Sequence, residues 1–365
     1  MTPYWLIYSA LSFLAFTSRV RHYKIKGFFQ DNFNLLTFFL FLFFSIFIGF
    51  RFDVGGDWEN YLNIYLEQAD KTVSTNIFIA DPSFLFLNWL SYEIGIGYHG
   101  LNFLCALIFT YGVLKFCRYL PRPNVAILVS FPYLINIVGM GYQRQSVAIG
   151  IMLLAFISLF KYQNFRFFLL VTLAATFHKS AIIFYPLMIF STRSNKFLLF
   201  LLMSLGILGG YFLLVEARLG HMIDNYIYLQ KSSTGAMYRV LMLVVPALIF
   251  IIYRKQFNIL DIERRVWTLF SFGSFILFIG LLSLDVSTTI DRLALYILPI
   301  QLFVFSHLAN IFKPLSRPII NLGIIVYYGI VLFVWANFGT HSEEWIPYDN
   351  AIIRLLIGDR TYFGV

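Results

Sequence analysis

Long apolar stretches follow one another along the whole chain and leave little else between them. Hydrophobic residues make up 59% of the 365 residues, and charged residues only 12%. A soluble protein carries about twice that share of charged residues. The composition therefore excludes soluble enzymes, nucleic-acid-binding modules and disordered proteins. It predicts an all-α, polytopic membrane protein that forms a single integral membrane domain over residues 1–365.

A helix that crosses the hydrocarbon core of a bilayer needs roughly 20 mostly apolar residues. The stretches that approach this length are Thr2–Thr17, Asn34–Phe50, Gly100–Cys117, Val125–Gly141, Ser146–Phe160, Phe197–Val215, Met237–Tyr253, Trp267–Leu284, Leu293–Asn310 and Pro318–Asn337. The segment at 84–97 is shorter and more polar, so we expect an interfacial helix there. The stretch Phe165–Phe190 is too long for one ordinary span and carries His178 in its middle.

Charge distribution decides between one span and two in Phe165–Phe190, because lysine and arginine accumulate in cytoplasmic loops. Two short spans that meet at His178 leave most of the 27 basic residues in short cytoplasmic loops. A single span would instead place the cluster Arg254, Lys255, Arg264 and Arg265 outside. We therefore predict about twelve transmembrane helices with both termini extracytoplasmic. The larger outward loops are then 51–83, 216–236 and 338–365.

The densest polar patch is the run from Arg51 to Tyr61, which follows the second predicted span. Gly55 and Gly56 permit backbone conformations that turn carboxylates back toward the membrane. Asp53 and Asp57 are therefore candidates for a general base or a divalent-cation site. The alternative is a solvated acidic loop in which Arg51 pairs with Asp53.

Arginines at the outward ends of predicted spans form a second candidate group: Arg51, Arg144, Arg239 and Arg292. A guanidinium group suits a bidentate grip on phosphate. Gln143 precedes Arg144 in a tight turn that begins the next helix, and a helix N-terminus favours anions. These side chains either bind a pyrophosphate together or form separate ion pairs, for which Asp53, Asp285 and Asp291 are available.

His178 is an ionisable residue inside an apolar stretch, which is by default a functional hypothesis in a membrane protein. A neutral imidazole takes a proton near pH 7, as a general base must. The alternative is that His178 and Lys179 cap the turn between two short spans. Near the C-terminus, the segment from His341 to Asp349 mixes acids with aromatic residues and suits either saccharide binding or an interfacial aromatic belt.

The run from Arg51 to Tyr61 resembles the R-x-x-x-G-x-D-[YW]-x-x-Y signature of the EpsG-like family of bacterial membrane proteins, which are Wzy-type polymerases of O-antigen and exopolysaccharide. Three further features fit in order, namely Arg144 with the apolar helix after it, the run from Phe177 to Ala181, and Trp345-Ile346-Pro347-Tyr348. Trp58 stands where this family usually has tyrosine, and it remains an interfacial aromatic residue.

The resemblance implies a polymerase at the outer face of the bacterial inner membrane. Its donor and acceptor would be undecaprenyl-pyrophosphate-linked oligosaccharides, and it would need no nucleotide. We expect no cofactor and no metal site, with use of a divalent cation left open. Arg144, with His178 or Asp57 as base, would be catalytic. The substrate-binding residues would be Arg51, Asp53, Tyr61, Gln143, Arg239, Arg292 and Tyr348. The expected partners are the lipid bilayer and these lipid-linked units, with a chain-length regulator left open and no nucleic acid.

Other functions remain alternatives to this reading. A lipid-linked oligosaccharide flippase or transporter needs polar groups that face both sides of the membrane, whereas the polar clusters here are skewed outward. A membrane O-acyltransferase also uses a histidine in an apolar helix, but no inward-facing cluster resembles its site. A structural scaffold leaves His178 and Arg144 without a role.

Overall fold

The computed structural model describes residues 1–18, 33–68, 81–191, 197, 200–201, 204, 235–283 and 287–358. Within these residues the chain is helical, and its only β-type pairing is an isolated bridge between Arg51 and Asn350. The predicted all-α fold is thus confirmed for the described part. The predicted span Phe197–Val215, most of the predicted loop 216–236 and Asp285 lie outside it.

Six helical segments in the described part are long and apolar enough to cross a membrane. They are α5 (Gly97–Tyr119), the segment Pro123–Gly141, α8 (Gln143–Phe160), α12 (Ala236–Tyr253), α13 (Asp261–Ser283) and the segment Pro314–Phe338. A seventh arises if α14 (Ser287–Ile297) and α15 (Pro299–Ile311), bent by 43°, count as one span. Membrane character is therefore supported, whereas the total of about twelve crossings stays a prediction.

Two of these six segments are not single uniform helices. Pro123–Gly141 consists of α6 (Pro123–Ser130), the π-helix η2 (Phe131–Val138) and the short α7 (Gly139–Gly141). Pro314–Phe338 consists of the 3₁₀-helix η5 (Pro314–Ser316) and α16 (Arg317–Phe338). Pro123 is the first residue of α6, where a backbone N–H would have no partner within the helix, so a proline is tolerated there.

Shorter helices complete the fold. The apolar ones are α1 (Thr2–Phe16), α2 (Leu35–Gly49), α9 (Asn164–Phe177) and the 3₁₀-helix η3 (Lys179–Phe190). The others are α3 (Trp58–Gln68), α4 (Pro82–Glu93), η6 (Ser342–Glu344) and α17 (Ala351–Leu356). Helix α4 is the short helix expected near 84–97, although it begins two residues earlier and ends at Glu93.

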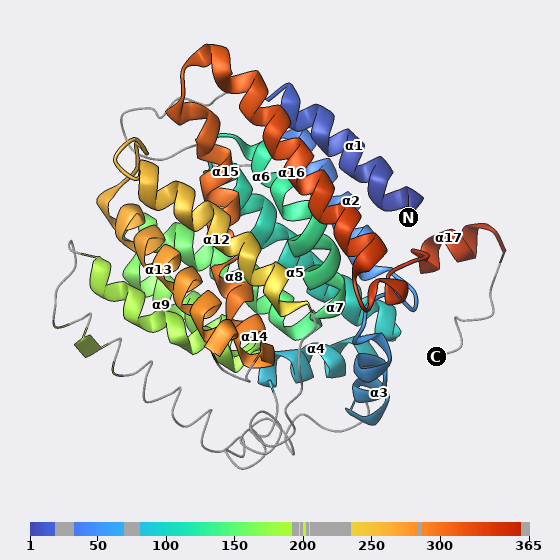
Figure 1. Cartoon of the computed structure of the whole chain (residues 1–365). Helices are drawn as coiled ribbons and strands as arrows, with labels where there is room; N and C mark the ends of the chain where they lie inside the picture. Colours follow the sequence, from blue (N-terminus) through green and yellow to red (C-terminus); the bar gives the residue numbers. More distant parts are fainter. Residues whose placement is uncertain are drawn as a thin grey trace.

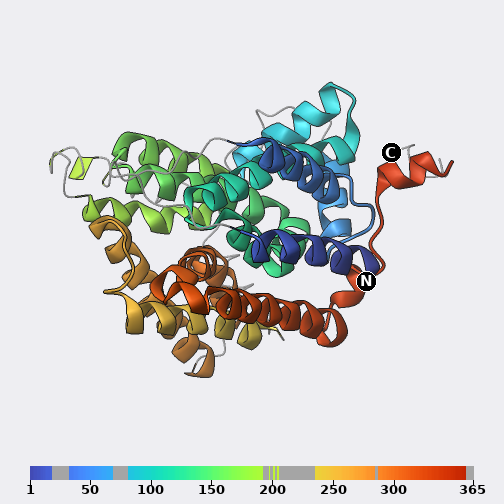
Figure 2. The same ribbon diagram turned by 90° about the horizontal axis from the view of Figure 1, so that it is seen from above.

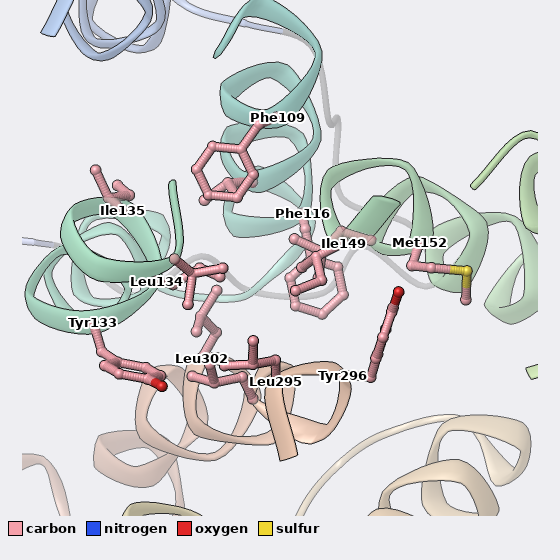
Figure 3. Close-up of a cluster of buried hydrophobic side chains, with 14 of the residues drawn as sticks. Phe109, Phe116, Tyr133, Leu134, Ile135, Ile149, Met152, Leu295, Tyr296 and Leu302 are labelled. Carbon is pink, nitrogen blue, oxygen red and sulfur yellow. The ribbon is translucent and has the colours of Figure 1, made fainter. Parts of the chain in front are cut away.

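The core is densest around α5 and α8. A Cβ atom added to Gly112 of α5 would lie 2.0 Å from the carbonyl oxygen of Gly150 on α8, so the two backbones touch at this crossing. Figure 3 shows Phe109 and Phe116 of α5 gathered with Tyr133 and Leu134 of η2, and with Leu302 of α15, in one buried cluster. Seen from above, the helices before residue 191 lie on one side of the molecule and α12–α16 on the other (Figure 2).

The connections between helices gather at two opposite ends (Figure 1). At the first, which we call the site end, the 50–57 loop meets the 339–350 segment through Phe52 N–H to Asp349 C=O (3.1 Å) and Gly55 N–H to Glu344 C=O (2.8 Å). At the second, the basic end, Arg122 donates hydrogen bonds to the Asn321 side chain and to the Ser18 carbonyl. These bonds tie α6 to α16 and to the end of α1.

Helices α9 and η3 form a hairpin that reaches both ends. At its turn, His178 lies within the electrostatic influence of Arg144 and Arg292 at the site end. Phe190, the last residue of η3, lines a cavity with Arg254 and Lys255 at the basic end. A 3₁₀-helix rises about 2.0 Å per residue, so the 12 residues of η3 cover about 24 Å. Helices α9 and η3 thus meet at His178, whereas two membrane passes there stay a prediction.

Candidate functional site

The 50–57 loop packs against the start of α8 because of its backbone geometry. Asp53 and Gly55 both have positive φ, 49° and 107°. A Cβ atom on Gly55 would lie 2.6 Å from the carbonyl oxygen of Met140 in α7, so only glycine allows this approach. The loop therefore places the half-buried Asp57, and after it Tyr61 of α3, near the N-terminus of α8. Asp53 is exposed.

Arg144, in the first turn of α8, is held by two other elements. Its Nη1 lies 2.8 Å from Oδ2 of Asp81, the residue before α4. Its guanidinium carbon lies 5.7 Å from the centre of the Tyr61 ring, and its N–H donates a long 3.4 Å hydrogen bond to the Tyr61 hydroxyl. Sequence reasoning missed Asp81, although an aspartate directly before a Pro-initiated helix signals a helix start.

His178 is oriented by a serine and a tyrosine that sequence reasoning did not select. Its Nδ1 lies 2.5 Å from Ser180 Oγ and 3.3 Å from the Tyr296 hydroxyl. Ser180 Oγ in turn donates to the Tyr296 hydroxyl at 3.1 Å. Both hydroxyl groups therefore lie on the Nδ1 side of the imidazole ring. Within the described residues, Nε2 has no hydrogen-bond partner.

Electrostatic interactions join His178 to two arginines, and the same two arginines to Asp57. Burial, and then the positive charges of Arg144 and Arg292, lower the pKa of His178 to about 3 at its position between the two short helices. Burial raises the pKa of Asp57, and the charges of Arg292 and Arg144 oppose that rise. Two guanidinium groups therefore act on both an imidazole and a carboxyl group. The four side chains come from α8, α14, the α9–η3 turn and the 50–57 loop.

Arg239 lies beside this group but is already paired. Its Nε and Nη2 lie 2.5 Å and 2.8 Å from the two carboxylate oxygens of Asp291, a bidentate ion pair between α12 and α14. The neighbouring Arg292 has an exposed side chain, and its carbonyl accepts a 2.9 Å hydrogen bond from Gln145 of α8. The expected pairing of an outward arginine with Asp291 is confirmed.

Arg51 does not join the other predicted arginines. It is 1% exposed, and it donates to the carbonyls of Val54 (3.1 Å) and Ile48 (2.8 Å), so it holds the loop from within. Nor is its expected pairing with Asp53 found, because those carbonyls occupy its guanidinium group and Asp53 is exposed. An arginine can bind backbone carbonyls as well as phosphate, and the sequence does not distinguish the two uses.

Tyr348 and Gln143 are also buried away from the exposed part of the group. The Tyr348 hydroxyl donates to the Phe47 carbonyl at 2.7 Å, and its ring stacks on Phe47 with centroids 4.4 Å apart. Gln143 is 2% exposed, and neither of its amide atoms has a hydrogen-bond partner among the described residues. Of the ten predicted site residues, the electrostatic group therefore unites Asp57, Tyr61, Arg144, His178 and Arg292.

In the described part of the chain, no three His, Cys, Asp or Glu side chains are placed to hold a metal ion. The expectation that the protein uses no metal therefore stays a prediction.

Comparison with known proteins gives one match. The model of the EpsG family matches residues 34–350, which include the 50–57 loop, the arginines of the site and the His178 turn. No curated protein and no solved structure matches the chain.

Proposed function

The chain belongs to the EpsG family, and on this premise we propose that it is a polysaccharide polymerase that joins lipid-pyrophosphate-linked oligosaccharide repeat units. The donor is a growing glycan on an undecaprenyl pyrophosphate carrier, and the acceptor is the next lipid-linked unit. The products are a glycan longer by one unit and the free carrier pyrophosphate. The reaction needs no nucleotide, because the glycosyl pyrophosphate is already an activated donor.

The chemistry is a glycosyl transfer. The bond between the donor anomeric carbon and a pyrophosphate oxygen breaks, and the electron pair leaves with the pyrophosphate. An acceptor hydroxyl forms the new bond to the anomeric carbon and loses its proton to a base. Catalysis therefore needs positive charge where the leaving group develops and a base within reach of the acceptor hydroxyl.

The observation that carries the proposal is the position of His178 relative to Arg144 and Arg292. The Nδ1 side of the ring is occupied by Ser180 and Tyr296, which leaves Nε2 as the basic atom. Burial, and then the charges of the same two arginines, disfavour the protonated imidazole, so the ring is neutral at physiological pH. A pyrophosphate bound to these arginines would offset their charge and make Nε2 a stronger base. In this proposal Arg144 and Arg292 bind the pyrophosphate and Nε2 takes the acceptor proton. Asp57 is the second candidate base.

Charge distribution supports an outward-facing site. The basic end carries Arg122, Arg254, Lys255, Arg264 and Arg265, whereas most carboxylates of the described residues lie at the site end. Because basic residues accumulate in cytoplasmic loops, we propose that the site faces the outer side of the inner membrane, where lipid-linked units await polymerisation.

The test is elongation of a defined lipid-linked oligosaccharide by the purified protein in detergent. We expect polymer from the wild-type protein, and only the single unit from His178→Ala and from Arg144→Ala. His341→Ala is the matched control, because His341 is an exposed histidine at the same end whose side chain pairs with Glu344. Wild-type ladder lengths from His178→Ala would remove that residue from the mechanism.

The same experiment separates the alternatives. Movement of labelled substrate across vesicle membranes without elongation would indicate a flippase. Transfer of an acyl group to the glycan would indicate an O-acyltransferase.

A further inference from the structure

A cavity of about 780 Å³ opens at the basic end, far from His178 and the arginines of the proposed site. Its basic lining residues are Arg254, Lys255, Arg264 and Arg265, and its other walls are formed by Phe190, Thr268, Leu269 and Phe272. The cavity therefore brings the end of η3, the end of α12 and the first turns of α13 around one space. No carboxylate belongs to this lining.

The four cations differ in how firmly they are held. The guanidinium of Arg264 donates to the carbonyl of Arg254 and, at 3.2 Å, to that of Phe257, so it is fixed in place. Arg254, Lys255 and Arg265 are exposed and have no carboxylate partner among the described residues. The nearby Glu263 is 1% exposed and accepts hydrogen bonds from the Tyr119 hydroxyl (2.7 Å) and from Leu260 N–H (2.9 Å), so it does not neutralise them.

The apolar wall of the cavity continues along α13. Leu269 and Phe272 are 46% and 53% exposed, and Ile276 and Ile279 follow with 67% and 61%. These residues are spaced by three and four positions, so they form one stripe on the helix that runs from the cavity toward the site end. In a membrane protein such a stripe contacts acyl chains.

We propose that this cavity binds a diacyl phospholipid with an anionic headgroup. Its phosphate lies among Arg254, Lys255, Arg264 and Arg265, and an acyl chain lies along the α13 stripe. A cluster of cations without carboxylates selects negative charge, and the adjoining exposed apolar stripe selects a lipid over a small anion. This site does not depend on the proposed polymerase activity.

The test uses purified full-length protein and native mass spectrometry in detergent with added phosphatidylglycerol. The variant Arg254→Gln/Arg265→Gln removes two exposed cations from the cavity and leaves Arg264 in place. The matched control, Arg166→Gln/Lys313→Gln, removes two exposed cations elsewhere at the basic end. We expect bound phosphatidylglycerol to fall about tenfold in the cavity variant and less than twofold in the control.

A second variant tests the apolar wall. Leu269→Ser/Phe272→Ser changes two exposed side chains, so folding should persist, and size-exclusion chromatography checks this. We expect phosphatidylglycerol binding to fall about fivefold, with phosphatidylcholine binding weak throughout. Equal losses in the cavity variant and its control would overturn the proposal, since the basic end would then attract lipid only by its overall charge. Inorganic phosphate that competes at micromolar concentration would overturn it as well, because the site would then bind small anions.

Discussion

The site end and the basic end both rely on arginine, but they surround it differently. At the site end, Arg144 and Arg239 are paired with carboxylates from other parts of the chain, and the charges of Arg144 and Arg292 act on an imidazole and on a further carboxyl group. At the basic end, Arg122 and Arg264 bind backbone carbonyls or an amide. The first environment combines acid, base and positive charge, as chemistry requires. In the second, cations predominate and the nearby Glu263 is buried, which suits packing and the anion binding that we propose.

The strongest test of this difference between the two ends is to remove an arginine from the site end. Arg292→Ala should lower elongation about 100-fold or more, because a preorganised cation at a leaving group contributes on that scale. The measurement is the initial rate of polymer formation by purified protein.

Arg354→Ala is the matched control for Arg292→Ala, because Arg354 lies at the same end, pairs with Asp349 and stacks over Phe52. Its rate should stay within about threefold of wild type. Equal losses of elongation rate in both variants would mean that any positive charge at the site end supports elongation, and not Arg292 in particular.

Tyr296→Phe should have a smaller effect on catalysis. The hydroxyl does not reach substrate in our proposal, but it accepts a hydrogen bond from Ser180. This bond favours the proposed tautomer, in which Nδ1 donates to Ser180 and Nε2 is the base. We expect kcat to fall about tenfold with little change in KM, because general-base catalysis as a whole contributes more than this. Tyr92→Phe, an exposed tyrosine of α4, should leave both parameters unchanged. A change in KM alone would contradict the positioning role.

Arg122→Gln at the basic end should affect stability and leave turnover intact. The variant weakens hydrogen bonds from a charged donor, which typically contribute about 1.5–3 kcal/mol each, so we expect a lower free energy of unfolding in denaturant titrations. Lys313→Gln, an exposed residue at the same end, is the control. Lost turnover per folded molecule of Arg122→Gln would show that the two ends are not separate in function.

The smallest expected effect is a shift in titration. His178 should stay neutral down to about pH 4, because burial and the charges of Arg144 and Arg292 lower its pKa to about 3. Arg292→Gln removes one of these charges, so the pKa should rise and protonation should begin at higher pH. NMR titration of isotope-labelled histidine measures both, and an unchanged pKa would place Arg292 farther from the ring than the structure does.

Composition and charge predicted much of this molecule. The all-α fold and most helix positions of the described residues followed from apolar length, and the break between α9 and η3 falls at His178 as expected. That these two helices cross the membrane stays a prediction. These features depend on how a bilayer treats apolar and charged residues in general, and not on the contacts of any one side chain. The roles of individual side chains could not be predicted from composition and charge, since Arg51 and Arg292 have the same chemistry and differ only in what surrounds them. Asp81, Ser180 and Tyr296 become visible only when helices distant in sequence are packed together.

The α9–η3 hairpin has a consequence for the rest of the chain. Its two helices start and finish at the same end, so as the two predicted membrane passes they would leave the orientation of every later helix unaltered. The hairpin can thus place the His178 imidazole at the site end without changing the orientation of the helices that follow. Reporter domains fused just before and just after the hairpin would report the same compartment.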